Sequence, residues 1–254
     1  MEEGKKHFVL VHGAAHGAWC WYKLIPLLKS SGHKVTALDL GASGVDPNRL
    51  DEIATISDYA RPLMEFMASL PEDERVVLVG HSSGGLSCAL AMETFPGKIA
   101  VAVFLSAFMP DTLHSPSFVL DQFQRGIFHF HCQATCFFNF LFFSLHSDSG
   151  FLRVSHKKDM ELAKALARPS SLFLHDLGKA EKFTEEGYGS VSRVYVICNE
   201  DRGMEEEFQR WMIQNYVVEE VVEIKESDHM AMLCEPIKLF DCLSKVADNY
   251  SLDW

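Results

Sequence analysis

Residues 75–84 of this chain read RVVLVGHSSG, an apolar run that leads into two glycines flanking His81, Ser82 and Ser83. Consecutive apolar residues without alternation are typical of a strand buried on both faces. Residues Gly84–Thr94 then have the spacing of a helix. A strand, a tight turn with the pattern G-x-S-x-G and a helix together predict a nucleophile elbow, in which a strained turn exposes a serine hydroxyl. The candidate nucleophile is therefore Ser82, and a helix-capping serine is the alternative interpretation.

The same alternation of buried strands and amphipathic helices extends in both directions from this motif. Short apolar runs predict further strands at Phe8–Val11, Lys34–Leu40, Ile99–Leu105, Val191–Cys198 and Glu219–Ile224. Helical spacing predicts helices at Trp19–Ser30, Ile56–Leu70, Met204–Gln214 and Pro236–Ala247. Strands that alternate with helices predict an α/β fold with a mostly parallel central sheet and helices on both faces.

The strand pattern stops between Pro110 and about Ser190, where helices are expected at Met160–Ala167 and Ser171–Lys179. We expect residues 110–188 to form an inserted cap, or lid, between two parts of one core, residues 1–109 and 189–254. Ligands of such folds bind at the carboxyl edge of the sheet, so the cap is expected to cover that edge.

Composition narrows the classes of partner. The chain has 254 residues, and 35 acidic against 23 basic residues give a formal charge of −12. This balance argues against nucleic acid and against anionic membrane surfaces, both of which require clustered Lys and Arg. The first residues lack the apolar core of a signal peptide, and the seven scattered cysteines are expected to be reduced thiols. We therefore expect a soluble, cytoplasmic protein.

One uncharged segment, Gly126–Ser147, requires separate consideration. It is long enough to span a bilayer, but polar residues interrupt it throughout, which argues against a transmembrane helix. It also contains His129, His131, Cys132 and Cys136, whose spacing matches no standard zinc site. An aromatic lid with incidental histidines is the preferred interpretation, and no metal or other cofactor is expected.

A serine nucleophile needs a base and an orienting acid, which follow it in this fold in the order acid, then histidine. Asp201 comes just after the strand that ends at Cys198, and His229 just after the strand that ends at Ile224. Both are therefore expected at the sheet edge that carries Ser82. The predicted triad is Ser82, Asp201 and His229, with Glu200 and Asp228 as rival acids.

A developing oxyanion needs preorganised donors. The backbone N–H of Ser83, directly after the nucleophile, is one candidate. The second is the N–H of Ala14, in the loop after the first strand, where Gly13 and Gly17 permit close approach of the backbone.

Seven stretches carry a resemblance to a known family. They are HFVLVHGAAHGAWCWYKLIPLL (7–28), GHKVTALDLGASGVDP (32–47), VVLVGHSSGG (76–85), VFLSAFMPD (103–111), RPSSLF (168–173), GYGSVSRVYVICNED (187–201) and DHMAMLCEP (228–236). Together they resemble the plant methylesterase family, which includes the salicylic-acid-binding esterase, methyl jasmonate esterases and polyneuridine aldehyde esterase and has hydroxynitrile lyases as close kin. The resemblance covers roughly residues 5–122 and 159–248.

This resemblance implies an α/β-hydrolase fold with a cap that acts without a cofactor on small methyl esters, through the triad already reached from the residues. It also implies that His16, Phe108, Leu172 and Met230 line the substrate pocket beside Ala14 and Ser83. Ordinary core packing is the alternative for Phe108, Leu172 and Met230. The expected partner is a small methyl ester such as methyl salicylate, methyl jasmonate or methyl indole-3-acetate, and a homodimer is compatible with the sequence.

Two alternatives to an esterase remain. Hydroxynitrile lyases of the rubber-tree and cassava type carry threonine where this chain has Gly13 and lysine where it has Met230, which argues against lyase activity. Residues 124–158 do not match the family's cap and are shorter than it. This departure leaves open a divergent lid, a mis-spliced exon or a degenerating copy, and hence a catalytically weak or inactive small-molecule binder.

Overall fold

The computed structural model describes residues 5–126 and 157–250. Within these ranges, six strands form one sheet in the order β2-β1-β3-β4-β5-β6, and every pair of neighbours is parallel. The strands are β1 (His7–Val11), β2 (Lys34–Leu38), β3 (Val76–His81), β4 (Ile99–Leu105), β5 (Arg193–Cys198) and β6 (Glu220–Ile224). The predicted α/β fold with a parallel central sheet is confirmed.

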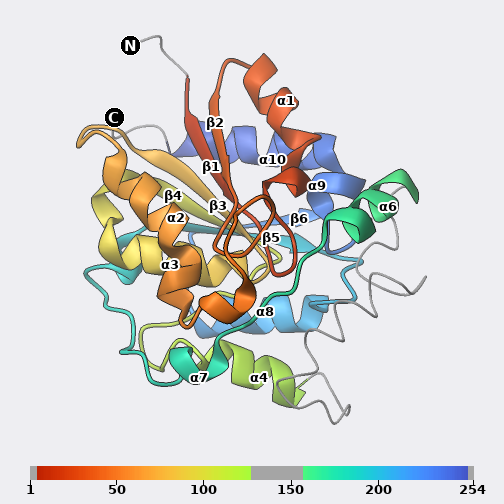
Figure 1. The fold of residues 1–254 in the computed structure, drawn as a ribbon. Helices are drawn as coiled ribbons and strands as arrows, with labels where there is room; N and C mark the ends of the chain where they lie inside the picture. Colours follow the sequence, from red (N-terminus) through yellow and green to blue (C-terminus); the bar gives the residue numbers. More distant parts are fainter. Residues whose placement is uncertain (1–4, 127–156, 251–254) are drawn as a thin grey trace.

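Helices cover both faces of the sheet (Figure 1). One face carries η1 (Ala18–Trp21), α1 (Leu24–Ser30), α9 (Ala231–Cys234) and α10 (Pro236–Asn249). The other face carries α2 (Ile56–Ser69), α3 (Gly84–Thr94) and α8 (Glu206–Asn215). The remaining helices of the described residues are η2 (Leu50–Glu52), η3 (Pro96–Lys98), α4 (Phe118–Gly126), α6 (Lys157–Leu166), α7 (Leu174–Leu177) and η4 (Tyr188–Ser190).

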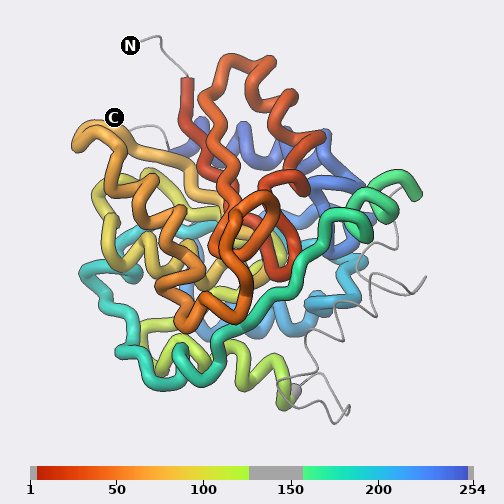
Figure 2. The backbone as a smooth tube through the Cα atoms, viewed as in Figure 1, coloured from red at the N-terminus to blue at the C-terminus, as the bar shows by residue number. Residues whose placement is uncertain are grey.

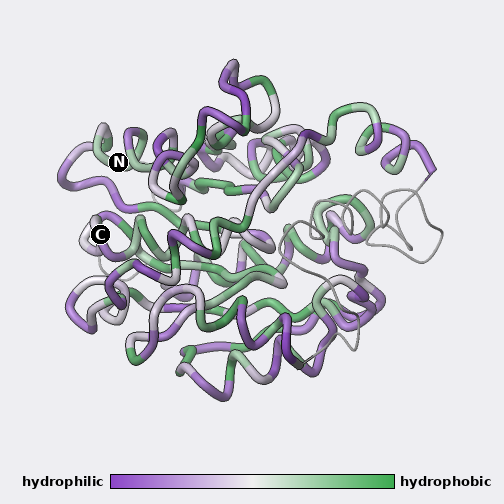
Figure 3. The backbone as a smooth tube through the Cα atoms, turned by 60° about the horizontal axis from the view of Figure 1, so that its bottom comes forward, coloured by the Kyte–Doolittle hydropathy of each residue, from purple (hydrophilic) through white to green (hydrophobic). Residues whose placement is uncertain are grey.

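The sheet separates two hydrophobic cores. Successive side chains of a strand point to opposite faces, so Phe8 and Leu10 of β1 pack with η1, α1 and α10, whereas Val9 and Val11 pack with α2 and α3. All four side chains are fully buried. Figure 3 shows the hydrophobic strands at the centre of the molecule, with hydrophilic stretches gathered on the outer loops and helices.

The described parts of the predicted cap join both cores. Val119 and Phe123 of α4 and Leu177 of α7 belong to the core that contains α2 and α3, whereas Ala163 of α6 belongs to the other. Residues 127–156 lie outside the described residues. They include the predicted aromatic lid, the residues considered as zinc ligands and nearly all of the segment considered as a transmembrane helix. Among the residues that are described, no helix is long and apolar enough to cross a membrane.

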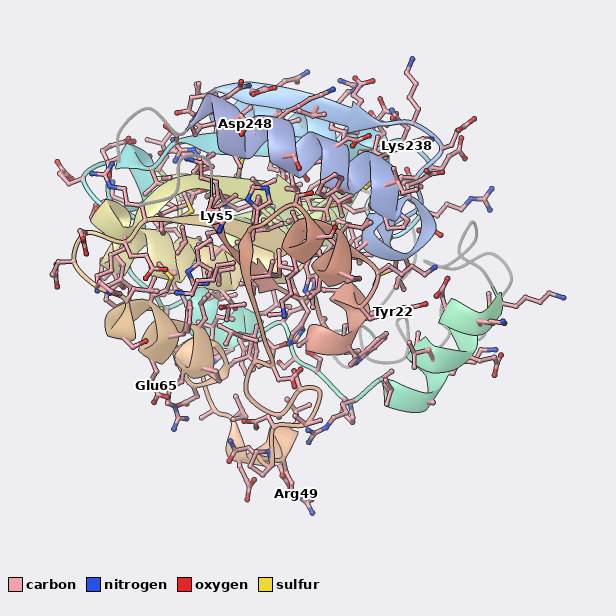
Figure 4. All side chains as sticks on the ribbon, turned by 90° about the horizontal axis from the view of Figure 1, so that it is seen from above. Lys5, Tyr22, Arg49, Glu65, Lys238 and Asp248 are labelled. Carbon is pink, nitrogen blue, oxygen red and sulfur yellow. The ribbon has the colours of Figure 1, made fainter. Side chains whose placement is uncertain are left out.

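An ion pair fastens α6 to the first helices of the core. The buried carboxylate of Asp159 accepts hydrogen bonds from the Tyr22 hydroxyl and the Lys23 ammonium, each at 2.6 Å. Figure 4 shows Tyr22 where the first helices face α6. The hydrogen bond to Asp159 raises the pKa of the Tyr22 hydroxyl to about 12.

Several predicted elements differ from the structure in their bounds; the helix expected at Ser171–Lys179, for example, is only the short α7. The single helix predicted at Trp19–Ser30 is wrong: it is a 3-10 turn followed by α1, whose first turn contains Pro26. Proline lacks an N–H and is tolerated best in the first turn of a helix, which is where the start of α1 at Leu24 places Pro26. The second strand ends at Leu38 rather than Leu40, because the Asp39 carboxylate accepts hydrogen bonds from the N–H groups of Ala18 and Val45.

Candidate active site

The strand order places the loops after β1 and β3 beside one another. From β1 the chain passes to β2 on one side, and it then returns to form β3 on the other side of β1. The switch point of the topology therefore falls between β1 and β3, where open α/β sheets form a crevice at their carboxyl ends. Residues 12–17 follow β1 and residues 82–84 follow β3, and Gly13 lies directly against Ser82, so the predicted oxyanion loop and the predicted nucleophile meet at this edge of the sheet.

The turn at Ser82 has the geometry of a nucleophile elbow. Ser82 has a φ of +54°, a strained conformation for a residue with a side chain. A Cβ on Gly80 would lie 2.7 Å from the Cys88 Sγ, and a Cβ on Gly84 would lie 2.5 Å from the carbonyl oxygen of His12. Close packing of β3 and α3 against each other and against β1 therefore requires both glycines of the G-x-S-x-G pattern.

A hydrogen bond joins the predicted acid to the predicted base. The Nδ1 atom of His229 lies 2.6 Å from Oδ2 of Asp201. The other carboxylate oxygen, Oδ1, accepts the backbone N–H groups of Gly203 at 2.7 Å and Met204 at 2.8 Å. Asp201 is 4% and His229 5% exposed. A carboxylate accepts only, so the proton of the neutral imidazole lies on Nδ1 and Nε2 carries the lone pair that a general base needs.

The rival acids occupy different environments. Glu200 is exposed to solvent. Asp228 is buried, and its Oδ1 accepts the backbone N–H of Met230 at 2.9 Å. Asp201 is hydrogen-bonded to the His229 ring, as the predicted triad requires.

Three further histidines surround this pair. His12 donates from Nδ1 to the Gly13 carbonyl at 2.8 Å and accepts the Leu40 N–H at Nε2. His81 donates from Nε2 to the His229 carbonyl at 2.8 Å, and the two rings lie 4.6 Å apart. Burial lowers the pKa of His12, lowers that of His81 well below its usual value and lowers that of His16 to about 4. All three are therefore neutral near pH 7.

The loop after β1 is held in place from several sides. His16 donates from Nδ1 to the Ala14 carbonyl at 2.8 Å, and Ala15 has a φ of +61°. A Cβ on Gly13 would lie 2.7 Å from the Cβ of Ser82, so the backbone at this position touches the predicted nucleophile. Gly17 also has no room for a side chain, but a Cβ there would meet Asp39 and Gly44 rather than the predicted nucleophile.

The backbone N–H groups of Ala14 and Ser83 are the predicted oxyanion donors. Both residues are buried. Among residues 5–126 and 157–250, neither N–H donates to another protein group. Two uncommitted donors beside Ser82 are what stabilisation of a tetrahedral oxyanion requires.

Arg168 connects the cap to this loop. Its backbone N–H donates to the Ala15 carbonyl at 3.1 Å. Its guanidinium donates to the carbonyl oxygens of Gly44, Asp46 and Asn48, at 3.2, 2.6 and 2.8 Å. Figure 2 shows the chain after α6 passing beside the loop that follows β2 on its way to α7.

The residues predicted to line the pocket are all buried. The Phe108 N–H donates to the Ser82 carbonyl at 3.0 Å, and Met230 directly follows His229. His16 stacks on Trp19 with ring centroids 5.1 Å apart, and its buried Nε2 has no partner among the described residues. Phe108 and Leu172 belong to the core around α3, whereas Met230 belongs to the core around α10. Core packing alone also accounts for these three apolar side chains.

Sequence reasoning missed two residues that hold Asp201 in place. The Ser106 hydroxyl donates to Asp201 Oδ2 at 2.5 Å. Gln209 of α8 binds the backbone N–H and C=O of Cys198 and the carbonyl of Met204, which fixes the loop that carries Asp201. Ser106 directly follows a predicted strand, and this position was a signal for it. Gln209 lies within a helix and offered none.

In the described part of the chain, no group of three or more His, Cys, Asp or Glu side chains is placed to bind a metal ion. The five described cysteines, at positions 20, 88, 198, 234 and 242, are free thiols.

Comparison with known proteins gives consistent matches over nearly the whole chain. A family model described as the alpha/beta hydrolase family matches residues 8–238. Methylesterase 1 of Arabidopsis thaliana is 52% identical over 98% of this chain and 98% of its own length. Salicylic acid-binding protein 2 of Nicotiana tabacum is 53% identical over 99% of this chain and 100% of its own.

A solved structure and a second type of enzyme are also among the matches. The crystal structure of polyneuridine aldehyde esterase superposes with a TM-score of 0.89 at 47% identity, covering 96% of this chain and 100% of that one. An alpha-hydroxynitrile lyase of Arabidopsis thaliana is 50% identical over 98% of this chain and 99% of its own. Similarity at this level therefore extends to more than one reaction.

Proposed function

Because this chain belongs to the plant methylesterase family of α/β hydrolases, we propose that it is a carboxylesterase that hydrolyses methyl esters of small plant signalling acids. The observation that carries the proposal is the arrangement at one sheet edge. Ser82 lies on a strained elbow after β3, and His229 after β6 is hydrogen-bonded to Asp201 after β5.

In the proposed reaction the Ser82 oxygen attacks the ester carbonyl carbon while its proton passes to Nε2 of His229. The intermediate collapses and releases methanol, which takes up that proton, and the acyl group stays on Ser82. Water then attacks the acyl carbon and gives its proton to His229, and the free acid leaves as Ser82 recovers a proton. Asp201 holds the tautomer of His229 and stabilises the imidazolium. Water is the only second substrate that this sequence of steps needs.

The oxyanion of each tetrahedral intermediate is assigned to the backbone N–H groups of Ala14 and Ser83. Their lack of other protein partners among the described residues and their burial support this role. Backbone donors fixed before the reaction need no reorganisation as charge develops, and one such donor typically contributes about 100- to 1000-fold in kcat.

Two positions favour ester hydrolysis over cyanohydrin cleavage. Gly13 leaves no room for a side chain, since a Cβ would lie 2.7 Å from that of Ser82. Met230 is fully buried and offers a thioether where lyases of the rubber-tree and cassava type carry a lysine. Because a hydroxynitrile lyase is 50% identical to this chain, cyanide release from mandelonitrile remains the activity to test beside hydrolysis.

The proposed acyl pocket is apolar and aromatic, lined by Phe108, Leu172 and Met230 with His16 as its polar member. Such a lining suits the ring of salicylate or indole-3-acetate or the apolar body of jasmonate. A relative named as a salicylic acid-binding protein supports methyl salicylate as the first ester to try. A site that binds the acid without turnover is the alternative for a chain whose cap departs from the family.

The test is a panel of p-nitrophenyl acetate, methyl salicylate, methyl jasmonate, methyl indole-3-acetate and mandelonitrile, assayed with the wild type and with Ser82→Ala. We expect ester hydrolysis by the wild type, loss of that hydrolysis in the variant, and no cyanide release. Folded wild-type protein that hydrolyses none of the esters would contradict the proposal. Tight salicylate binding in that case would establish a binder.

A further inference from the structure

Ser106 occupies an unusual position at the end of β4. It directly follows Leu105 and is fully buried, and its N–H donates to the Val196 carbonyl at 2.9 Å. Its φ is +39°, a value that costs free energy for a residue with a side chain. Strain of this kind persists only where the surrounding structure imposes it, and it concentrates at functional sites.

The side chain of Ser106 contacts the predicted acid directly. Its hydroxyl lies 2.5 Å from Asp201 Oδ2, the same oxygen that accepts the Nδ1–H of His229 at 2.6 Å. A carboxylate has no proton to give, so Ser106 is the donor. Two donors therefore share one oxygen, and each reduces the negative charge that the other experiences.

The backbone around Ser106 contacts the predicted nucleophile. The Ser82 N–H donates to the Leu105 carbonyl at 3.3 Å, and the Phe108 N–H donates to the Ser82 carbonyl at 3.0 Å. Residues 105–108 thus hold the elbow through the main chain, while the Ser106 side chain holds Asp201. One short segment fixes both ends of the triad.

We propose that Ser106 is a positioning residue that sets Asp201 relative to Ser82 and, by sharing Asp201 Oδ2, limits how strongly that carboxylate stabilises protonated His229. The proposal rests on the proposed function, since it assigns His229 as the base. It adds a fourth side chain to the machinery, one that touches the acid rather than the substrate.

The other titratable groups around Asp201 and His229 do not obscure the titration of this pair. His81 at the end of β3 and His16 in the loop after β1 have pKa values lowered by burial. Tyr195 and Cys198 of β5 have pKa values raised well above their usual range, again by burial. These four groups are therefore neutral near pH 7. Asp228, on the same loop as His229, accepts the Met230 N–H.

The experiment compares Ser106→Ala with Ser87→Ala as a matched control. Ser87 is equally buried, on α3, and its hydroxyl has no partner among the described residues, so its loss removes the same atom without touching Asp201. Ser106→Gly is a second variant, because glycine accepts a positive φ and separates loss of the hydroxyl from backbone strain.

Two readouts are measured against pH. The first is kcat/KM on the best ester of the panel. The second is the proton NMR resonance of the His229 Nδ1–H, assigned by its absence in His229→Ala, which reports the pair even if no ester is turned over. Without the Ser106 hydroxyl, Asp201 stabilises the imidazolium more strongly. The acid limb and the NMR midpoint should both move to higher pH, by roughly half a unit to one unit.

The expected result is this shift in both Ser106 variants and its absence in Ser87→Ala. Folded Ser106 variants whose NMR midpoint matches the wild type would overturn the proposal, even if their kcat falls. A shifted NMR midpoint without ester turnover in any protein would keep the role of Ser106 and count against the proposed esterase function instead.

Discussion

The change Asp201→Asn tests most sharply how the acid acts on the base. In the structure Asp201 Oδ1 accepts two backbone N–H groups, from Gly203 and Met204, and Oδ2 accepts from His229 and Ser106. An asparagine must place its oxygen where the two backbone donors point. Its NH2 group then faces Nδ1 of His229, and two donors cannot share that contact.

The His229 imidazole therefore carries its proton on Nε2 instead of Nδ1. Nε2 then has no lone pair to accept the Ser82 proton. The same loss of tautomer in a serine protease lowers kcat about 10⁴-fold, which corresponds to about 5 kcal/mol of transition-state stabilisation. We expect a loss of that size here with little change in KM, because Asp201 lies behind His229 and does not contact substrate.

Steady-state hydrolysis of the best ester in the panel measures this effect. Glu200→Gln is the matched control: it makes the same change at the neighbouring acid, which is exposed, and should alter kcat/KM by no more than about twofold. Melting temperatures establish that both variants are folded. An Asp201→Asn variant that keeps more than about a tenth of wild-type kcat would refute the reasoning, because the tautomer of His229 would then be set by another group.

Three further outcomes are expected. Gly85→Ala places a Cβ 2.2 Å from a backbone carbonyl oxygen and should lower the free energy of unfolding by about 1–3 kcal/mol, roughly 2–12 °C in melting temperature. In the control Gly97→Ala, the new Cβ meets no atom within 4 Å and should leave the melting temperature unchanged. Equal melting temperatures for the two variants would contradict this. Burial lowers the pKa of His16 from 6.5 to about 4, so between these pH values the unfolded chain binds a proton that the folded chain does not. The free energy of unfolding should therefore fall by about 3 kcal/mol as the pH drops from 6.5 to about 4. Urea titrations at about pH 7 and about pH 4 should show a smaller loss for His16→Gln, and an identical loss would count against the assignment. Arg168→Ala removes three hydrogen bonds to carbonyls of the loop after β2, against which Gly17 of the oxyanion loop packs, and should lower kcat/KM roughly ten- to hundredfold by loosening that support. Exposed Arg61→Ala should leave kcat/KM unchanged.

The centre of the sheet was predictable because its strands β1, β3, β4 and β5 are buried on both faces. Runs such as Val76–Val79 leave no polar side chain to accommodate, so composition alone marks them. The elbow was predictable for a related reason, since its glycines are required by contacts within a few residues of Ser82 or across one neighbouring strand. Element ends were harder. The helix break depends on Pro26. The strand end at Leu38 depends on Asp39, whose carboxylate accepts a hydrogen bond from Ala18 in another segment of the chain.

The choice among acids shows where sequence reasoning stops. Asp201, Glu200 and Asp228 all follow strands at the correct edge, and they differ only in where the folded chain points each carboxylate. Ser106 makes the same point more strongly. Its position after a predicted strand marks it only as a residue at the correct edge, and its partner Asp201 is 95 residues away in the sequence.

The most direct test of the central claim is mass spectrometry of the enzyme quenched early in its reaction with p-nitrophenyl acetate. The account predicts one acetyl group on the peptide that contains Ser82. That label should be absent from Ser82→Ala and should form much more slowly in His229→Ala. Turnover without a label on Ser82, or with the acetyl group on another residue, would contradict it.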